Sequence, residues 1–261
     1  MNGIERIAAA FARSGKRAAL MPYLMGGFPD METSLRIGEA YADGGADLVE
    51  LGIPFSDPLA DGPVIHAAGT AALEAGATVD GVLELAAALS ERFPVVVMTY
   101  ANLVLARTPE GFVDALARAG VSGLIVPDLP LEEAPTVLGA CDAGGIALVP
   151  LVAPTTPDAR LAAIGERARG FVYTVSVAGT TGERHSAEDA YAGVVRRAQA
   201  HTDVPVALGF GIGTPEQASA AATAGADGVI VGSRLVRAAA EADDPAAAVR
   251  DVVAAMADAL R

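Results

Sequence analysis

Residues 49–63 read VELGIPFSDPLADGP, and they join the end of an apolar strand to a proline-rich loop. Glu50 lies among aliphatic neighbours, and Asp61 comes just before a run with helical periodicity. A buried carboxylate is costly unless it is paired, protonated or used in a reaction. The two acids are therefore the first candidates for chemistry, provided that the fold brings them to one site.

Eight apolar, strand-like runs occur along the chain. They are Ala18–Met25, Leu48–Leu51, Val95–Thr99, Gly123–Val126, Ala147–Leu151, Phe171–Val175, Val204–Leu208 and Gly228–Val231. Alanine-rich stretches with helical periodicity separate them, and several of these end at a glycine that leads directly into the next strand. Because the runs are continuously apolar rather than alternating, we expect strands that are covered on both faces, as in a parallel sheet.

This order of elements predicts an α/β fold, a (β/α)8 TIM barrel, since eight βα units in about 250 residues match that architecture. Ile4, Ile7 and Phe11 predict an amphipathic helix before the first strand, and the long second connection predicts a loop and helix inserted after strand 2. A doubly wound open sheet is the alternative, but no strand followed by Gly-x-Gly-x-x-Gly opens the chain. No linker divides residues 1–261, so we expect a single barrel domain.

Composition and charge limit the partners. The 261 residues carry a net charge of −14, and no cluster of lysine and arginine exceeds two adjacent residues. This balance argues against binding to nucleic acid or to an anionic membrane surface. The uncharged run of residues 93–106 is too short to span a membrane, and the N-terminus lacks an apolar signal core. The single cysteine, Cys141, fits a reducing cytosol, so we expect a cytoplasmic protein.

Three acids follow strands of the predicted barrel, at the end where active sites lie in this architecture. Glu50 ends the second strand, Asp61 lies in the loop after it, and Asp128 follows the fourth. If Val49 and Leu51 face the helices, Glu50 points into the barrel, where an apolar interior raises a carboxyl pKa and suits it to general acid/base catalysis. Structural alternatives stay open: a paired Glu50, an Asp61 that caps a helix, and an Asp128 that only shapes a turn.

Glycine-rich loops follow the last strands and suit a phosphate group. Residues 209–215 (GFGIGTP) follow the seventh strand, and Gly232 and Ser233 follow the eighth. Barrels often bind phosphate between these loops and a helix N-terminus, where free N–H groups and the helix dipole meet the anion. A third loop, residues 178–184 (AGTTGER), follows the sixth strand and suits a closing lid. Plain turn glycines are the alternative.

Missing residue types limit the chemistry further. Lys16 is the only lysine and precedes the first strand, which argues against a Schiff-base mechanism, because that mechanism needs a lysine at a strand end. His66, His185 and His201 are too scattered to predict a metal site, and no serine lies in a nucleophile elbow. What remains is metal-free and cofactor-free acid/base chemistry by carboxylates on a small phosphorylated substrate.

Motifs along essentially the whole chain resemble the tryptophan synthase alpha chain family. They are residues 22–29 (PYLMGGFP), 50–63 (ELGIPFSDPLADGP), 100–102 (YAN), 127–130 (PDLP), 209–212 (GFGI) and 232–233 (GS). The resemblance implies a lyase of L-tryptophan biosynthesis that cleaves indole-3-glycerol phosphate to indole and glyceraldehyde 3-phosphate by a retro-aldol reaction. It also implies that Glu50 is the general acid/base at indole C3 and that Asp61 accepts a hydrogen bond from the indole N–H.

The same resemblance implies further site residues. Those that would hold the phosphate through backbone amides are Gly182, Gly211, Gly232 and Ser233. Those that would surround the substrate are Tyr23, Met98, Tyr173, Thr181 and Phe210, and the lid residue Thr181 would also bond the catalytic aspartate. Met25 and His66 depart from the threonine and glutamine that are usual in the family, which leaves details of the pocket open.

A partner is implied as well. The family works as an αββα heterotetramer in which indole passes to a beta chain that carries pyridoxal phosphate, so no cofactor is expected in this chain. Pro54 and Asp57 would lie at that contact. Two alternatives stay open: a free-standing indole-3-glycerol phosphate lyase, and a catalytically silent phosphate-binding barrel that activates a partner. The presence of both Glu50 and Asp61 weighs against the silent barrel.

Overall fold

The computed structural model describes residues 1–175, 187–209 and 211–261. Its strands form one parallel sheet in the order β5-β4-β3-β2-β1-β9-β8-β7-β6. The strand bounds are β1 Ala19–Met25, β2 Val49–Gly52, β3 Val95–Met98, β4 Gly123–Ile125, β5 Ala147–Leu148, β6 Leu151–Val152, β7 Val172–Val175, β8 Val206–Gly209 and β9 Gly228–Val231.

The sheet closes through the fifth predicted strand, which the structure divides into β5 and β6. The N–H of Val149 donates to the carbonyl of Leu124 on one neighbour, at 2.9 Å, and the N–H of Tyr173 on the other neighbour donates to the carbonyl of Pro150, at 3.0 Å. Pro150 has no N–H of its own, so the strand is interrupted there. The first and last strands of the order, β5 and β6, are thus consecutive segments of the chain, and together they join β4 to β7. The sheet is closed, which confirms the predicted barrel.

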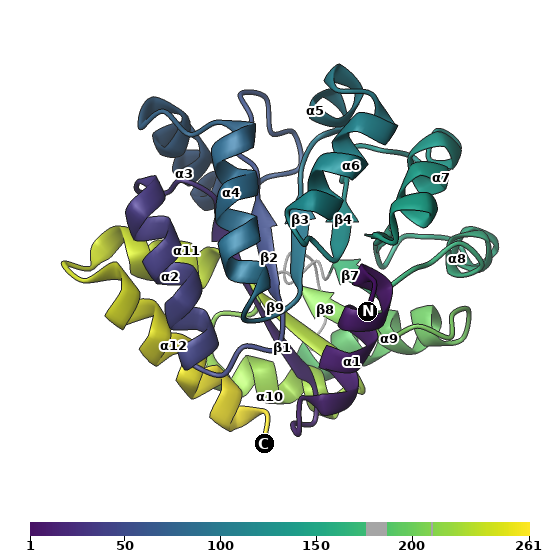
Figure 1. Ribbon diagram of the computed structural model, residues 1–261. Helices are drawn as coiled ribbons and strands as arrows, with labels where there is room; N and C mark the ends of the chain where they lie inside the picture. Colours follow the sequence, from purple (N-terminus) through teal and green to yellow (C-terminus); the bar gives the residue numbers. More distant parts are fainter. Residues whose placement is uncertain (176–186, 210) are drawn as a thin grey trace.

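Helices surround the strands (Figure 1). Their bounds are α1 Gly3–Arg13, α2 Met31–Asp43, α3 Pro63–Glu74, α4 Val79–Ser90, α5 Ala101–Ala106, α6 Pro109–Arg118, α7 Pro135–Gly144, α8 Asp158–Gly165, α9 Ala187–Gln199, α10 Pro215–Thr223, α11 Ser233–Glu241 and α12 Pro245–Ala259. Two helices, α3 and α4, separate β2 from β3, which confirms the predicted insertion. None of the described helices has the length and apolar character that crossing a bilayer requires.

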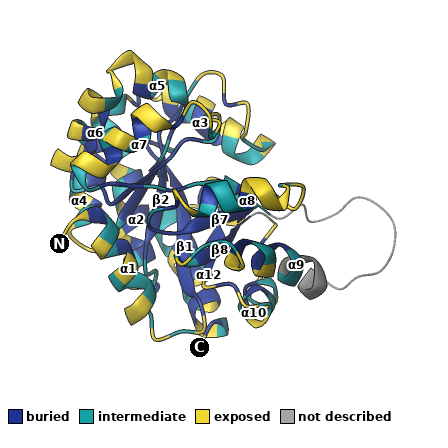
Figure 2. Cartoon of the chain, turned by 90° about the vertical axis from the view of Figure 1, so that its right-hand side faces the viewer, coloured by how far each residue is buried: buried dark blue, intermediate teal, exposed yellow. Residues whose placement is uncertain are grey.

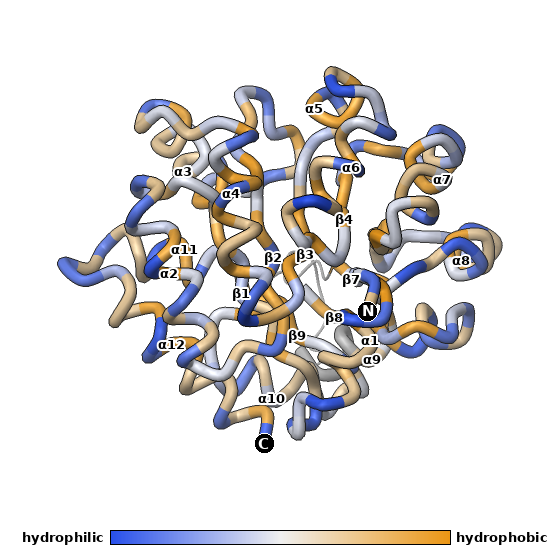
Figure 3. Tube along the Cα trace, viewed as in Figure 1, coloured by the Kyte–Doolittle hydropathy of each residue, from blue (hydrophilic) through white to orange (hydrophobic). Residues whose placement is uncertain are grey.

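The core has an inner and an outer layer, and β2 shows how the sequence divides between them. Val49 and Leu51 pack in the cluster between strands and helices, whereas Leu48 packs in the cluster that fills the barrel. The buried strands lie inside the exposed surfaces of the helices (Figure 2), and hydrophilic residues gather at the outer turns (Figure 3). Alternation along β2 therefore directs Glu50 to the inside, as predicted.

The predicted N-terminal helix closes the lower end of the barrel. Ile7 is fully buried in the inner cluster, and the Arg6 guanidinium donates to the carbonyls of Gly120, Phe93 and Ser90. Lys16 lies at this same end, where its ammonium pairs with Asp47 at 2.8 Å. The barrel is thus plugged at the N-terminal ends of the strands, and the loops after the strands form its open end.

Candidate active site

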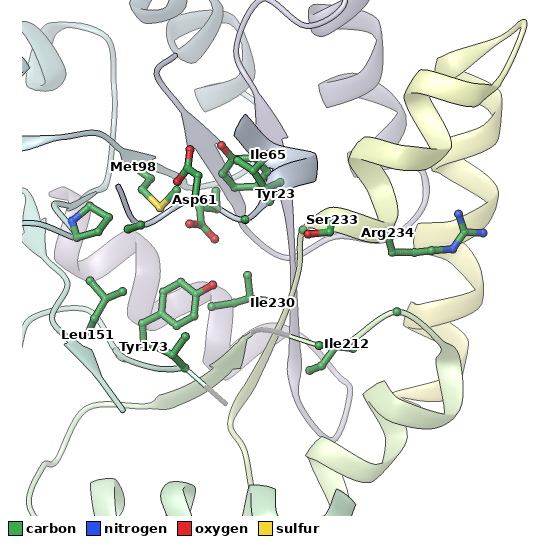
Figure 4. Close-up of a pocket in the computed structure, with 18 of the residues that line it drawn as sticks. Tyr23, Asp61, Ile65, Met98, Leu151, Tyr173, Ile212, Ile230, Ser233 and Arg234 are labelled. Carbon is green, nitrogen blue, oxygen red and sulfur yellow. The ribbon is translucent and has the colours of Figure 1, made fainter. Parts of the chain in front are cut away.

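A cavity of about 600 Å³ lies at the open end of the barrel (Figure 4). Eight residues predicted for the site line this one cavity: Tyr23, Glu50, Asp61, Met98, Tyr173, Gly211, Gly232 and Ser233. Thr181, Gly182 and Phe210 lie outside the described residues. Sequence reasoning missed several lining residues, among them Ile65, Ile230, Arg234 and Arg237.

Glu50 lines this cavity from strand β2. Its residue is 1% exposed, and its Oε2 atom has no hydrogen-bond partner within the part of the chain that the structure describes. Burial, with a smaller contribution from the negative charge of Asp61, raises the pKa of Glu50 to about 8. Among the described residues no arginine pairs with Glu50. Glu50 is therefore protonated at neutral pH and can donate a proton into the cavity.

Asp61 does not cap the helix that follows it. The N-cap of α3 is Gly62, which makes no side-chain bond, and Pro63 occupies the first helical position. Instead, Oδ1 of Asp61 accepts a hydrogen bond from the hydroxyl of Tyr100 at 2.8 Å. Burial raises the pKa of Asp61, whereas the Tyr100 bond and the charge of His66 act to lower it. The helix-cap alternative is thus wrong, and the carboxylate is free to meet a ligand.

Tyr100 contacts both Asp61 and other residues of the loop after β2 that contains Asp61. Its hydroxyl also accepts a hydrogen bond from the N–H of Ala60 at 3.1 Å, and its ring stacks on Phe55 with centroids 5.3 Å apart. Tyr100 belongs to the loop after β3, so its hydrogen bond to Asp61 ties two neighbouring βα loops together. The sequence gives no signal for this contact beyond the presence of a tyrosine in the YAN motif.

Asp128 has a structural task. Its Oδ1 accepts a hydrogen bond at 2.9 Å from the N–H of Ala101, the first residue of α5. That bond satisfies one of the donors that a helix N-terminus leaves free. Asp128 is not among the residues that line the cavity, although Pro127 is. The turn alternative fits this arrangement.

Glycines at two strand ends make room for the tyrosines of the pocket. A Cβ at Gly52 would overlap the hydroxyl of Tyr23, and a Cβ at Gly209 would overlap the ring of Tyr173. Tyr23 and Tyr173 are both buried, and the hydroxyl of Tyr23 lies 3.9 Å from the sulfur of Met25. Met25, which departs from the residue usual in the family, thus lies beside Tyr23 and is not among the residues that line the cavity.

The opposite side of the cavity offers backbone donors. Helix α11 begins at Ser233, and its N-cap, Gly232, makes no side-chain capping bond. The first N–H groups of a helix have no partner within it, and together with the helix dipole they favour an anion. Gly211, with φ of 78°, and Gly213 bring a second loop to the same place. This side is therefore suited to a phosphate group.

The loop between the two acids is partly exposed. Leu59 is 91% exposed and Asp57 is exposed, whereas Pro54 is buried within this chain. The loop therefore presents one large apolar side chain to solvent, as protein surfaces commonly do.

Comparison with known proteins gives a consistent result. Residues 9–260 match the family described as tryptophan synthase alpha chain. The chain is 50% identical over 223 residues to the tryptophan synthase alpha chain of Prochlorococcus marinus, covering 85% of this chain and 81% of that protein. It is 49% identical over 227 residues to that of Methanosarcina mazei, covering 86% and 82%.

Solved structures agree with this similarity. The chain resembles a structure of Mycobacterium tuberculosis tryptophan synthase with a TM-score of 0.89 and 39% identity, over 98% of each chain. It also resembles the tryptophan synthase subunit alpha of Legionella pneumophila, with a TM-score of 0.90 and 34% identity over 100% of this chain and 98% of that one.

Proposed function

The chain belongs to the tryptophan synthase alpha chain family, whose activity is the cleavage of indole-3-glycerol phosphate, and we propose that Glu50 and Asp61 perform this cleavage at the barrel mouth. The observation that carries the proposal is the pairing of two unlike acids in one cavity. Glu50 is buried and protonated at neutral pH, and Asp61 is partly exposed and held by Tyr100. Two acids in different environments divide acid and base roles between them.

In this reaction Glu50 acts first as an acid and then as a base, and Asp61 stabilises the charge that forms in between. Protonated Glu50 donates its proton to C3 of the indole ring, and the positive charge that develops at N1 is stabilised by the carboxylate of Asp61. The bond between C3 and the glycerol carbon then breaks, and its electron pair returns to the ring. The hydroxyl on that carbon becomes the aldehyde as its proton passes to the Glu50 carboxylate. Glu50 is protonated again at the end of the reaction, so no proton is gained or lost overall.

The substrate is placed with its ring between Tyr23, Met98 and Tyr173 and its phosphate at Gly211, Gly232 and Ser233. Thr181, Gly182 and Phe210 complete this proposed site. The test is the release of indole from indole-3-glycerol phosphate by the purified chain. Because the chain contains no tryptophan, indole fluorescence is measured without a competing tryptophan signal from this chain. A folded chain that releases no indole, alone or with a beta chain, would instead indicate the silent barrel.

A tryptophan synthase beta chain is the proposed partner, and the complex is an αββα heterotetramer whose pyridoxal phosphate belongs to the beta chain. The proposed contact includes Pro54 and the exposed Asp57 and Leu59. We expect the beta chain to raise the rate of indole release at least tenfold, because closing the site orders its acids, and about 1.4 kcal/mol gives that factor. Asp57→Ala should weaken the stimulation without changing the rate of the isolated chain. An unstimulated rate would favour the free-standing lyase.

Tyr100→Phe tests how Asp61 is held. The variant keeps the stack on Phe55 but removes the hydroxyl that donates to Asp61. A hydrogen bond to a charged group contributes about 1.5–3 kcal/mol, so we expect kcat to fall about tenfold or more. The bond favours ionised Asp61, so its loss raises the Asp61 pKa, and activity should fall more at pH 6 than at pH 8.

The matched control is Tyr41→Phe. Tyr41 is a buried tyrosine whose hydroxyl donates to the carbonyl of Tyr23 at 2.9 Å and does not touch Asp61. This variant should lose stability but keep the acid side of the pH profile in place. If both variants shift that side equally, Tyr100 acts on the fold rather than on Asp61.

A further inference from the structure

Two arginines line the cavity and have no part in the chemistry described above. Arg234 and Arg237 lie on α11, and their spacing of three residues places them on one face of that helix. They are the only basic side chains among the lining residues that the structure describes, and Glu50 and Asp61 are the only acidic ones. Asp61 lies on one side of the cavity, and Ser233 and Arg234 lie on the other (Figure 4). The cavity is thus electrically polarised.

Arg234 occupies a position that the helix itself disfavours. It follows Ser233 in the first turn of α11, where the helix dipole favours an anion and opposes a cation. That turn contains no acidic residue, and neither arginine forms an ion pair with a carboxylate in the part of the chain that the structure describes. A side chain placed against local preference, and without an ion-pair partner among the described residues, points to a role with a ligand.

The charge of the whole chain opposes the approach of an anionic substrate. With a net charge of −14, the protein repels a phosphate monoester dianion at long range. Both arginines are exposed, and the Arg234 side chain extends outward from the phosphate side of the cavity (Figure 4). A guanidinium there meets an incoming phosphate before the backbone N–H groups of α11 do, because those groups act only at short range.

We propose that Arg234 and Arg237 form an electropositive rim that captures the phosphate of the substrate and delivers it to the N-terminus of α11. This inference rests on the proposed function, since it assumes that the phosphate binds at Gly211, Gly232 and Ser233. The rim assists binding of the substrate and not the bond-breaking step. Its removal therefore raises KM and leaves kcat unchanged. Its effect is also screened by salt, unlike that of the backbone donors deeper in the cavity.

The test compares Arg234→Gln, Arg237→Gln and the double variant with wild type in the indole-release assay. We expect a loss in kcat/KM of about three- to tenfold for each arginine, at low ionic strength and with unchanged kcat. At about 0.5 M salt the Debye length falls to roughly 4 Å, and the difference from wild type should shrink to below about twofold. Arg234→Lys should keep most of the wild-type value, because it keeps the charge.

Arg250→Gln is the matched control. Arg250 is exposed on α12, pairs with Asp251 at 2.9 Å and does not line the cavity, so this variant removes the same charge elsewhere. Losses in the rim variants no larger than in Arg250→Gln, or losses confined to kcat, would overturn the proposal. Competition by inorganic phosphate separates this outcome from a failure of the proposed function. If phosphate does not compete in wild type, the phosphate site itself is wrong; if it competes equally in the rim variants, only the rim is wrong.

Discussion

Replacing Glu50 by glutamine should abolish indole release and at the same time stabilise the folded chain at neutral and alkaline pH. Glutamine has nearly the shape of the protonated acid but can neither give a proton to C3 nor accept one from the glycerol hydroxyl. General acid/base catalysis contributes about 10²- to 10⁴-fold, so we expect kcat to fall by at least about a thousandfold. Competition by inorganic phosphate should be unchanged, because Glu50 lies on β2, whereas the proposed phosphate residues follow β8 and β9.

The gain in stability follows from the direction of the pKa shift. Burial raises the pKa of Glu50 from 4.5 to about 8, so the folded chain holds this proton more tightly than the unfolded chain. Stability is therefore lost as pH rises from the unfolded value to the folded one, and it is constant above that range. Each pKa unit corresponds to about 1.4 kcal/mol, so wild type should lose roughly 2–4 kcal/mol relative to Glu50→Gln between pH 5 and pH 8.

Chemical denaturation of both proteins at pH 5 and pH 8 gives the change in the free energy of unfolding with pH. Any pH-independent effect of burying the glutamine amide is the same at both pH values, so it cancels when the two changes are compared. Glu84→Gln, at an exposed position on α4, serves as the control and should change neither activity nor the pH dependence of stability. Full activity of Glu50→Gln would refute the mechanism. An inactive variant with the wild-type pH dependence of stability would show that the Glu50 pKa is not raised.

Much of the barrel could be predicted from the sequence because its signals are local. Continuous apolar runs and glycines at helix ends mark the βα units, and alternation along β2 directs Glu50 inward whatever its neighbours are. The break at Pro150 had a local signal too, since proline cannot complete a central strand. The expectation of one unbroken fifth strand overlooked it.

The contacts that set the roles of the acids are not local. Tyr100 and Asp61 are 39 residues apart, and their bond exists only because β2 and β3 are neighbours and their loops turn toward each other. Before that geometry is known, an aspartate before Gly-Pro and a helical run reads equally well as a cap. Arg234 had a weak signal, because it directly follows the predicted phosphate residues, but only the cavity lining relates it to a site.

Asp61→Asn should produce the second large loss of activity, with a different signature from Glu50→Gln. The amide keeps the size of the side chain but cannot offset the positive charge that develops at the indole nitrogen. Removing one such electrostatic stabiliser lowers kcat by about 10²- to 10³-fold, so slow indole release should remain measurable. That residual activity allows a full pH profile to be recorded.

The two sides of that profile should change in opposite ways. Wild type requires ionised Asp61 and protonated Glu50, so its activity is bell-shaped, with the alkaline side set by the Glu50 pKa of about 8. Asp61→Asn removes the group that titrates on the acid side, so activity should no longer fall at low pH until the fold is lost. It also removes a negative charge that raises the Glu50 pKa, so the alkaline side should move to lower pH. A profile that keeps its acid side would assign that ionisation to another group, and an unmoved alkaline side would show that the two carboxyls do not interact. Because one substitution is expected to alter both sides, the profile tests the division of labour between the acids more strictly than any single rate.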